Sequence, residues 1–145
     1  IDYFKQINDR FGHQVGDACI RETALVMNRA LRPTDTIARV GGDEFAILLI
    51  DCTVLDARRT AERICVCVAD HRFDIDGRRH QLSVTVGGAE WDRGREAAQL
   101  FARADAALYQ AKRAGRGRVA WATAEDVVAH MSSTPGSNGA DAFAA

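Results

Sequence analysis

Two adjacent carboxylates, Asp43 and Glu44, follow a pair of glycines and precede the apolar run Phe45–Ile50. Adjacent carboxylates on a rigid turn can bind a hard cation such as Mg²⁺, which prefers carboxylate oxygens combined with the phosphates of a substrate. Gly41 and Gly42 have no side chains, so a nucleotide can approach the backbone closely. The same four residues also suit an ordinary polar turn between two strands. Taken alone, the acidic pair leaves both interpretations open.

The two acids lie on a predicted β-hairpin. Thr36–Val40 favours a short strand, and Phe45–Ile50 is a continuous apolar run typical of a buried strand. With the turn Gly41–Glu44 between them, residues 36–50 predict a hairpin whose tip carries both carboxylates.

Helices are predicted on both sides of this hairpin. Apolar residues recur at the helical period over residues 18–31, after the capping-box-like pair Thr53 and Asp56, and over residues 95–114. Gly12–Asp17 predicts a loop between helices, because two glycines four apart are flanked by polar residues. Asp17 then stands where a helix N-cap is expected.

Two further strands complete the predicted elements. Residues 82–86 alternate between apolar and hydroxyl side chains, which predicts a half-buried strand that Gly87 and Gly88 interrupt. Residues 118–121 predict a last short strand. The order of elements predicts an α+β sandwich, with helices packed on a mainly antiparallel central sheet.

Length and composition set limits on the class of protein. The chain has 145 residues and a formal net charge of −1, so it fits one domain and does not fit a generic basic nucleic-acid binder. The longest apolar runs are six residues, too short to span a membrane. No basic segment followed by an apolar one opens the sequence, so we expect no signal peptide. The four cysteines lack zinc-ligand spacing and suggest reduced thiols in a cytoplasmic protein. We expect a domain over residues 1–122 and a tail over 123–145, disordered from about residue 132 because Ser, Pro and Gly dominate there.

Three motifs in this order resemble the GGDEF family, the diguanylate cyclases. The pentapeptide Gly41–Phe45 is the family's signature. An opening motif includes Asp2, Phe4, Lys5, Asn8, Asp9, Gly12, His13, Gly16 and Asp17. A closing motif includes Ala104, Asp105, Ala107, Leu108, Tyr109, Ala111, Lys112, Gly115 and Arg116. The resemblance covers residues 1 to about 119 and implies the family's fold and its reaction.

That reaction condenses two GTP molecules into cyclic di-GMP and releases two pyrophosphates, in a homodimer whose two GGDEF domains face each other. The resemblance implies that Asp43 and Glu44 bind Mg²⁺ (or Mn²⁺), that Glu44 also activates the attacking 3′-hydroxyl, and that the backbone carbonyl of Ile1 contacts the metal. It implies no nucleic-acid partner, and contact with a membrane only through domains upstream of this chain.

The resemblance also assigns residues to GTP binding. Asn8 and Asp17 match the pair that recognises guanine, and Gly42 lets the α-phosphate lie close to the turn. Lys112 and Arg116 match the pair that binds the β- and γ-phosphates. Tyr3, Phe4 and Lys5 lie in the segment whose backbone N–H groups contact phosphate, so the resemblance assigns no role to their side chains. Each side chain also has an ordinary structural interpretation: a cap for Asp17, a turn for Asn8, and solvated charges at a helix C-terminus for Lys112 and Arg116.

A second set of residues resembles the family's inhibitory product site. Arg32 and Asp35 form an RxxD pattern at the expected distance before Gly41, and Arg63 matches an arginine that joins this site in some members. Arginine can bind phosphate or stack on guanine, and a carboxylate can accept the N–H donors of guanine. The alternative interpretation is an arginine at a helix end and an aspartate in a turn.

The chain departs from the family at its start. Members carry a strand ending in Asp-x-Asp before Phe-Lys; Asp2 is the second of these acids, and the first, a metal ligand, is missing. Because the missing strand lies inside the family's sheet, we expect its loss to leave backbone groups unpaired. We therefore expect the chain by itself to be inactive and poorly folded. The alternatives are a non-catalytic module that binds cyclic di-GMP and a purely structural fragment.

Overall fold

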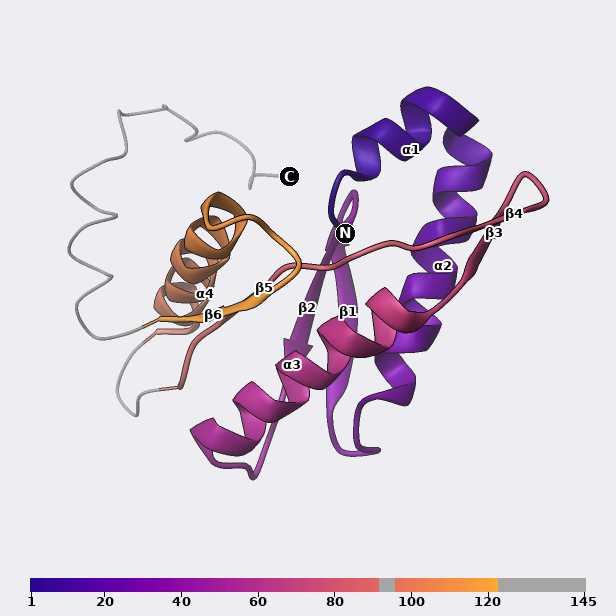
Figure 1. Ribbon diagram of the computed structural model, residues 1–145. Coiled ribbons are helices and arrows are strands. Elements are labelled where there is room, and N and C mark those ends of the chain that lie inside the picture. The colour runs from indigo at the N-terminus through magenta and orange to yellow at the C-terminus, as the bar shows by residue number, and fades with distance from the viewer. Residues whose placement is uncertain (92–95, 123–145) are drawn as a thin grey trace, which may run out of the picture.

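The computed structural model describes residues 1–91 and 96–122, and the predicted tail beyond residue 122 lies outside the described residues. The elements follow one another as α1 (Phe4–Phe11), α2 (His13–Arg29), β1 (Thr36–Gly41), β2 (Glu44–Leu48), α3 (Val54–Asp70), β3 (Phe73–Ile75), β4 (Arg78–His80), β5 (Val86–Gly88), α4 (Ala97–Arg113) and β6 (Val119–Trp121) (Figure 1).

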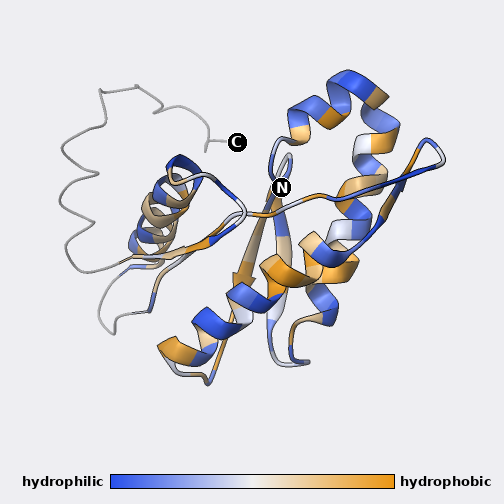
Figure 2. Ribbon diagram, viewed as in Figure 1, coloured by the Kyte–Doolittle hydropathy of each residue, from blue (hydrophilic) through white to orange (hydrophobic). Residues whose placement is uncertain are grey.

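The main core lies where α2, α3 and β3 meet. Its members are apolar residues that are almost fully buried: Ile7, Cys19, Val26, Met27, Ala30, Ile64, Val68, Phe73, Ile75 and Val84. The face of α3 predicted from the sequence, Ala57, Ala61, Ile64 and Val68, is buried as expected. Figure 2 shows that β2 is largely apolar, whereas α1 is mostly hydrophilic.

The strands of the described residues form three two-stranded sheets. β1 pairs antiparallel with β2, β3 pairs antiparallel with β4, and β5 pairs parallel with β6. Helices packed on mostly antiparallel strand pairs confirm the predicted α+β class. The parallel pairing of β5 with β6 was not expected from the sequence; α4 connects the two strands, as a parallel connection requires.

The hairpin that carries the acidic pair is confirmed. Thr36 pairs with Leu48 and Gly41 pairs with Glu44, which leaves Gly42 and Asp43 as a two-residue turn. Gly42 has a φ of 42°, a left-handed conformation that glycine adopts without a steric penalty. The guanidinium of Arg39 donates to the Gly42 carbonyl at 2.9 Å and braces the turn.

The predicted loop Gly12–Asp17 is wrong, because α2 already begins at His13. Gly12 alone, with a φ of 84°, breaks the chain between α1 and α2. Gly16 lies inside α2, and a β-carbon at this position would overlap with the Oδ1 atom of Asn8. The second glycine therefore permits close packing of α1 on α2 rather than a loop, and Asp17 is a helical residue and not an N-cap.

The predicted strand 82–86 is also corrected. The structure assigns β5 to Val86–Gly88, so Gly87 and Gly88 belong to the strand instead of interrupting it. A β-carbon on Gly87 would lie closer than 3.0 Å to the backbone of Ala104 and Leu108, and one on Gly88 would meet the ring of Trp121. The glycines are there because α4 and β6 pack directly on the backbone of this strand.

The start of α3 and the state of the cysteines agree with the sequence. Thr53 caps α3: its hydroxyl oxygen accepts from the amide of Asp56 at 3.1 Å and donates to the Asp56 carboxylate at 2.7 Å. All four cysteines are free thiols, and burial raises the pKa of Cys65 to about 11. Among the described residues, no helix is both long and apolar enough to cross a membrane.

Gly87→Ala should destabilise the fold, because the added methyl group meets helix backbone that cannot rotate away. We expect the free energy of unfolding, measured by urea titration, to fall by roughly 1–3 kcal/mol. Gly41→Ala is the matched control, since nothing lies within 4 Å of a β-carbon there. Equal stability of the two variants would contradict the close packing of α4 on β5.

Candidate functional site

The first residues of the chain lie beside the tip of the β1–β2 hairpin (Figure 1). The amino group of Ile1 donates to the backbone carbonyl of Asp43 at 3.0 Å and lies 3.8 Å from its carboxylate. Burial lowers the pKa of this amine, and nearby Lys112 lowers it further, whereas Asp43, Asp2 and Glu44 raise it. The backbone of Ile1 thus lies at the acidic tip, close to a lysine from the end of α4.

Asp2 joins three separate segments of the chain through its carboxylate. It is only 6% exposed and accepts hydrogen bonds from the hydroxyls of Ser83 (2.7 Å) and Thr85 (2.5 Å) and from the amide of Gly117 (3.1 Å). Its own amide donates to the carbonyl of Ser83 at 2.9 Å. Asp2 therefore fixes the chain start against the segment that leads into β5 and against the loop after α4.

The loop after α4 reverses the chain through three successive residues with positive φ. These are Gly115 (113°), Arg116 (62°) and Gly117 (58°). The amide of Arg116 donates to the carbonyl of Ala111 at 3.1 Å, which closes the helix end in the manner of a Schellman motif. The amide of Gly117 donates to the Asp2 carboxylate and, at 3.0 Å, to the hydroxyl of Thr85, which itself donates to Asp2. The loop that carries Arg116 is therefore attached to the same buried carboxylate, directly and through Thr85.

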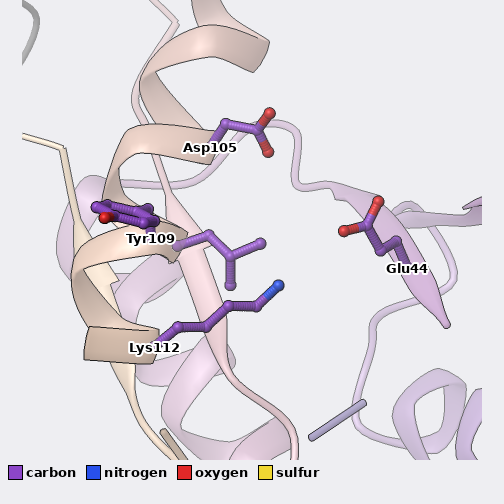
Figure 3. Close-up of a pocket in the computed structure, with 5 residues that line it drawn as sticks. Glu44, Asp105, Tyr109 and Lys112 are labelled. Atoms are coloured by element: carbon purple, nitrogen blue, oxygen red, sulfur yellow. The ribbon is translucent and has the colours of Figure 1, made fainter. Parts of the chain in front are cut away.

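An open pocket of about 250 Å³ separates the hairpin from α4. Glu44 lies on one wall, and Asp105, Leu108, Tyr109 and Lys112 line the other (Figure 3). In Figure 3 the side chain of Lys112 extends from α4 toward the side on which Glu44 lies. An acid and a base that the sequence separates by 68 positions therefore face one space, as a site for a phosphate with its metal requires.

The predicted guanine pair lies on the two N-terminal helices. Asn8 on α1 packs on Gly16 of α2, the residue before Asp17, and the ring of Phe4 also approaches Gly16. The Oδ1 atom of Asn8 is buried without a hydrogen-bond partner. A buried acceptor without a hydrogen-bond partner lowers the stability of the folded state. Asp17 and Lys5 have exposed side chains on α2 and α1.

The RxxD residues lie at the other end of the hairpin. Asp35 accepts a hydrogen bond from the amide of Arg32 at 2.8 Å, so the two residues form a tight turn before β1. Arg63 of α3 donates to the Ala30 carbonyl at 2.8 Å, which brings it to the same end. The six residues of β1 span about 20 Å, so this cluster is separate from the acidic tip.

A metal ion has few protein ligands available at the tip. Among the residues that the structure describes, no group of three His, Cys, Asp or Glu side chains is arranged to hold one. Asp43 and Glu44 are adjacent at the turn, and Mg²⁺ is commonly held by one or two carboxylates together with substrate phosphates. The donor set therefore fits a metal that arrives with a phosphate ligand.

Sequence reasoning missed two features of this site. Asp2 was noted only for its place in a motif, and its bonds to Ser83, Thr85 and Gly117 span more than eighty positions. The sequence indicates no role for the Tyr3 side chain, yet the guanidinium carbon of Arg116 lies 4.9 Å from the centroid of its ring. In the sequence, a polar partner for Asp2 is indicated only by the hydroxyls at positions 83 and 85, which share one face of an extended segment.

Comparison with known proteins places these features in a family. The sequence profile described as "Diguanylate cyclase, GGDEF domain" matches residues 1–118. The "Probable diguanylate cyclase DgcE" of Escherichia coli (strain K12) is 43% identical over 131 residues, which cover 90% of this chain but 12% of DgcE. This chain is therefore similar to a small part of that longer protein.

Two solved structures share the fold. The GGDEF domain of YfiN (TpbB) from Pseudomonas aeruginosa is 37% identical with a TM-score of 0.82, over 90% of this chain and 77% of that one. The GGDEF domain of DgcB from Caulobacter crescentus, solved in complex with c-di-GMP, is 38% identical with a TM-score of 0.79, over 83% of this chain and 72% of that one.

Asp2→Ala should release the loop that carries Arg116. Removing a buried carboxylate that accepts three hydrogen bonds should lower the free energy of unfolding by roughly 2–4 kcal/mol. The amide of Gly117 should also exchange with deuterium faster, as measured by NMR. Asp74→Ala, which removes an exposed carboxylate from β3, is the control and should change stability by less than about 0.5 kcal/mol. Unchanged protection of Gly117 would refute the role given to Asp2.

Proposed function

Because the chain belongs to the GGDEF family of diguanylate cyclases, we propose that it condenses two molecules of GTP into cyclic di-GMP and releases two pyrophosphates. The observation that carries this proposal is the shared pocket, with Glu44 of the hairpin tip on one wall and Lys112 of α4 on the other. Attack of a 3′-hydroxyl on an α-phosphate needs negative charge to be neutralised and both reactants to be held in line.

The acidic tip is proposed to serve the reacting phosphate. Asp43 and Glu44, with the backbone carbonyl of Ile1, would hold Mg²⁺ or Mn²⁺, which supplies charge neutralisation at the phosphates when bound. Glu44 is exposed beside the pocket and is the proton acceptor for the attacking hydroxyl. Nothing lies within 4 Å of the place where a β-carbon on Gly42 would be, which leaves room for the α-phosphate.

The rest of GTP is proposed to bind on either side of the chain start. Asn8 and Asp17 recognise guanine, because an amide and a carboxylate suit the acceptor and donor groups at the edge of this base. Lys112 and Arg116 bind the β- and γ-phosphates, and the backbone around Phe4 and Lys5 contributes N–H donors. Lys112 is half-buried beside the pocket, where its attraction to phosphate is less screened by water.

A single domain offers one such set of residues, whereas the product contains two guanylates. Two copies of the domain, each holding one GTP and facing each other, supply two 3′-hydroxyls and two α-phosphates. The active species is therefore proposed to be a homodimer, which is active only when the two pockets face each other.

Arg32, Asp35 and Arg63 are proposed as a separate product site. The DgcB domain solved with c-di-GMP shows that such domains bind this nucleotide. In this chain the three residues gather about 20 Å from the acidic tip, so product bound there inhibits by holding two domains apart and not by filling the GTP pocket. A chain that bound cyclic di-GMP at this product site but did not catalyse its synthesis would be a non-catalytic receptor.

The test of catalysis is a product assay. The chain is incubated with GTP and Mg²⁺, and the nucleotides are separated by chromatography, in parallel with the chain extended by a first strand ending in Asp. We expect cyclic di-GMP from the extended chain. In it, Asp43→Asn and Glu44→Gln should each lower the rate at least 100-fold, because each removes charge at the reacting phosphate. Glu62→Gln, an exposed position on α3, is the control.

Three outcomes of this assay are informative. Product from the short chain as well would contradict the expectation that the missing strand and its acid are required. Full activity of Glu44→Gln would contradict its role as proton acceptor. No product from a folded, extended chain would favour the receptor.

The product site is tested without catalysis. Cyclic di-GMP is titrated into Asp43→Ala by calorimetry, alone and combined with Arg32→Ala. We expect binding to survive Asp43→Ala and to weaken at least tenfold when Arg32 is also replaced, because an arginine bond to phosphate or guanine is lost. Arg29→Ala, an exposed arginine in the last turn of α2, is the matched control. Equal affinity with and without Arg32 would contradict the assignment.

A further inference from the structure

We propose that Tyr3 is a positioning residue that orients the guanidinium of Arg116 toward the terminal phosphates of the substrate. This inference rests on the proposed function, because it concerns the phosphate end of the GTP site. The sequence offers no assignment for the Tyr3 side chain, and only the fold brings its ring to Arg116.

The contact joins two distant parts of the chain. The guanidinium carbon of Arg116 lies over the Tyr3 ring at 4.9 Å from its centroid. A second contact of similar length, Arg10 over Phe11 at 5.0 Å, joins adjacent residues and fixes nothing beyond α1. The contact of Arg116 with Tyr3 connects the loop after α4 with the chain start, whose first residue lies at the acidic tip.

Both residues have an unusual backbone. Tyr3, just before α1, has a φ of 56°, and Arg116 has a φ of 62°. A left-handed conformation is uncommon for residues with a β-carbon and persists where the surrounding structure imposes it. Asp2 is next to both residues: it precedes Tyr3 directly, and its carboxylate accepts from the amide of Gly117, the residue after Arg116. One buried carboxylate therefore links the segments that carry the ring and the guanidinium.

The chemistry of the pair suits a phosphate ligand. The face of a tyrosine ring attracts a cation, and a guanidinium that contacts a ring through its own face keeps its N–H donors free at the edge. The ring is 54% exposed and Arg116 is half-buried, so both border solvent, where a ligand can reach the donors. The contact limits the conformations of a long side chain before the ligand arrives, which reduces the entropy lost on binding.

The experiment measures binding and not turnover. A non-hydrolysable GTP analogue with a methylene group between the α- and β-phosphates, and separately GMP, are titrated with Mg²⁺ by calorimetry. The parent chain in this experiment is the chain extended by a first strand ending in Asp, as in the product assay, and the variants are made in it. The variants are Tyr3→Leu, Tyr3→Phe, Arg116→Met and the double variant Tyr3→Leu with Arg116→Met. Phe101→Leu removes another exposed aromatic ring, on α4, and is the matched control. Circular dichroism verifies that each variant folds like the parent chain.

We expect Tyr3→Leu to weaken the GTP analogue roughly 2- to 5-fold, which corresponds to an exposed cation–π contact. GMP, which lacks the terminal phosphates, should bind Tyr3→Leu and the parent chain alike. Tyr3→Phe keeps the ring and should bind the analogue within about twofold of the parent chain. In the Arg116→Met background, Tyr3→Leu should have no further effect, because the residue through which it acts is gone.

NMR tests the contact between the two side chains directly. Protons of the Arg116 side chain should shift upfield over the Tyr3 ring, keep this shift in Tyr3→Phe and lose it in Tyr3→Leu.

The outcomes separate this inference from the function on which it rests. If the parent chain binds no GTP analogue, the proposed function fails, and this inference fails with it. If the parent chain binds the analogue and Tyr3→Leu binds it equally well, only the role of Tyr3 is refuted. A similar loss for GMP, or the same loss in the Arg116→Met background, would also refute positioning through Arg116.

Discussion

The structure of the site depends on one buried carboxylate. Asp2 accepts hydrogen bonds from two hydroxyls and one amide, which come from the segment before β5 and from the loop after α4. A buried charge is stable only when such bonds replace its water. Asp2 therefore determines where three segments meet, and through them how the chain start, Arg116 and the acidic tip lie relative to one another.

Close approach of backbones is the second constraint. Gly87 and Gly88 let α4 and Trp121 pack directly on β5, and Gly16 lets α1 pack on α2 through Asn8. Each of these glycines has an ordinary backbone conformation; Gly12 and Gly42, by contrast, have positive φ and form turns. The glycines of the opening motif thus have different physical roles: one bends the chain, and the other removes a side chain where two helices touch.

The hairpin separates two candidate functions in space. Its tip carries Asp43 and Glu44 beside the pocket that Lys112 lines, whereas the turn before β1 holds Arg32 and Asp35. The product site is proposed to act through the arrangement of whole domains, because it lies away from the acidic tip.

The structural features that depend on neighbouring residues along the chain could be predicted from the sequence. The β1–β2 hairpin with its acidic tip, the Thr53 cap and the buried face of α3 followed from periodicity and turn residues, and the motifs identified the family. The features that depend on contacts between distant residues could be seen only in the folded structure. It showed that Gly16 and Asp17 are helical, that Gly87 and Gly88 form a strand parallel to β6, that Asp2 bonds to Gly117, and that Tyr3 meets Arg116. The physical reason is that packing of one backbone on another, and the burial of a charge, bring together residues that sequence patterns treat as unrelated.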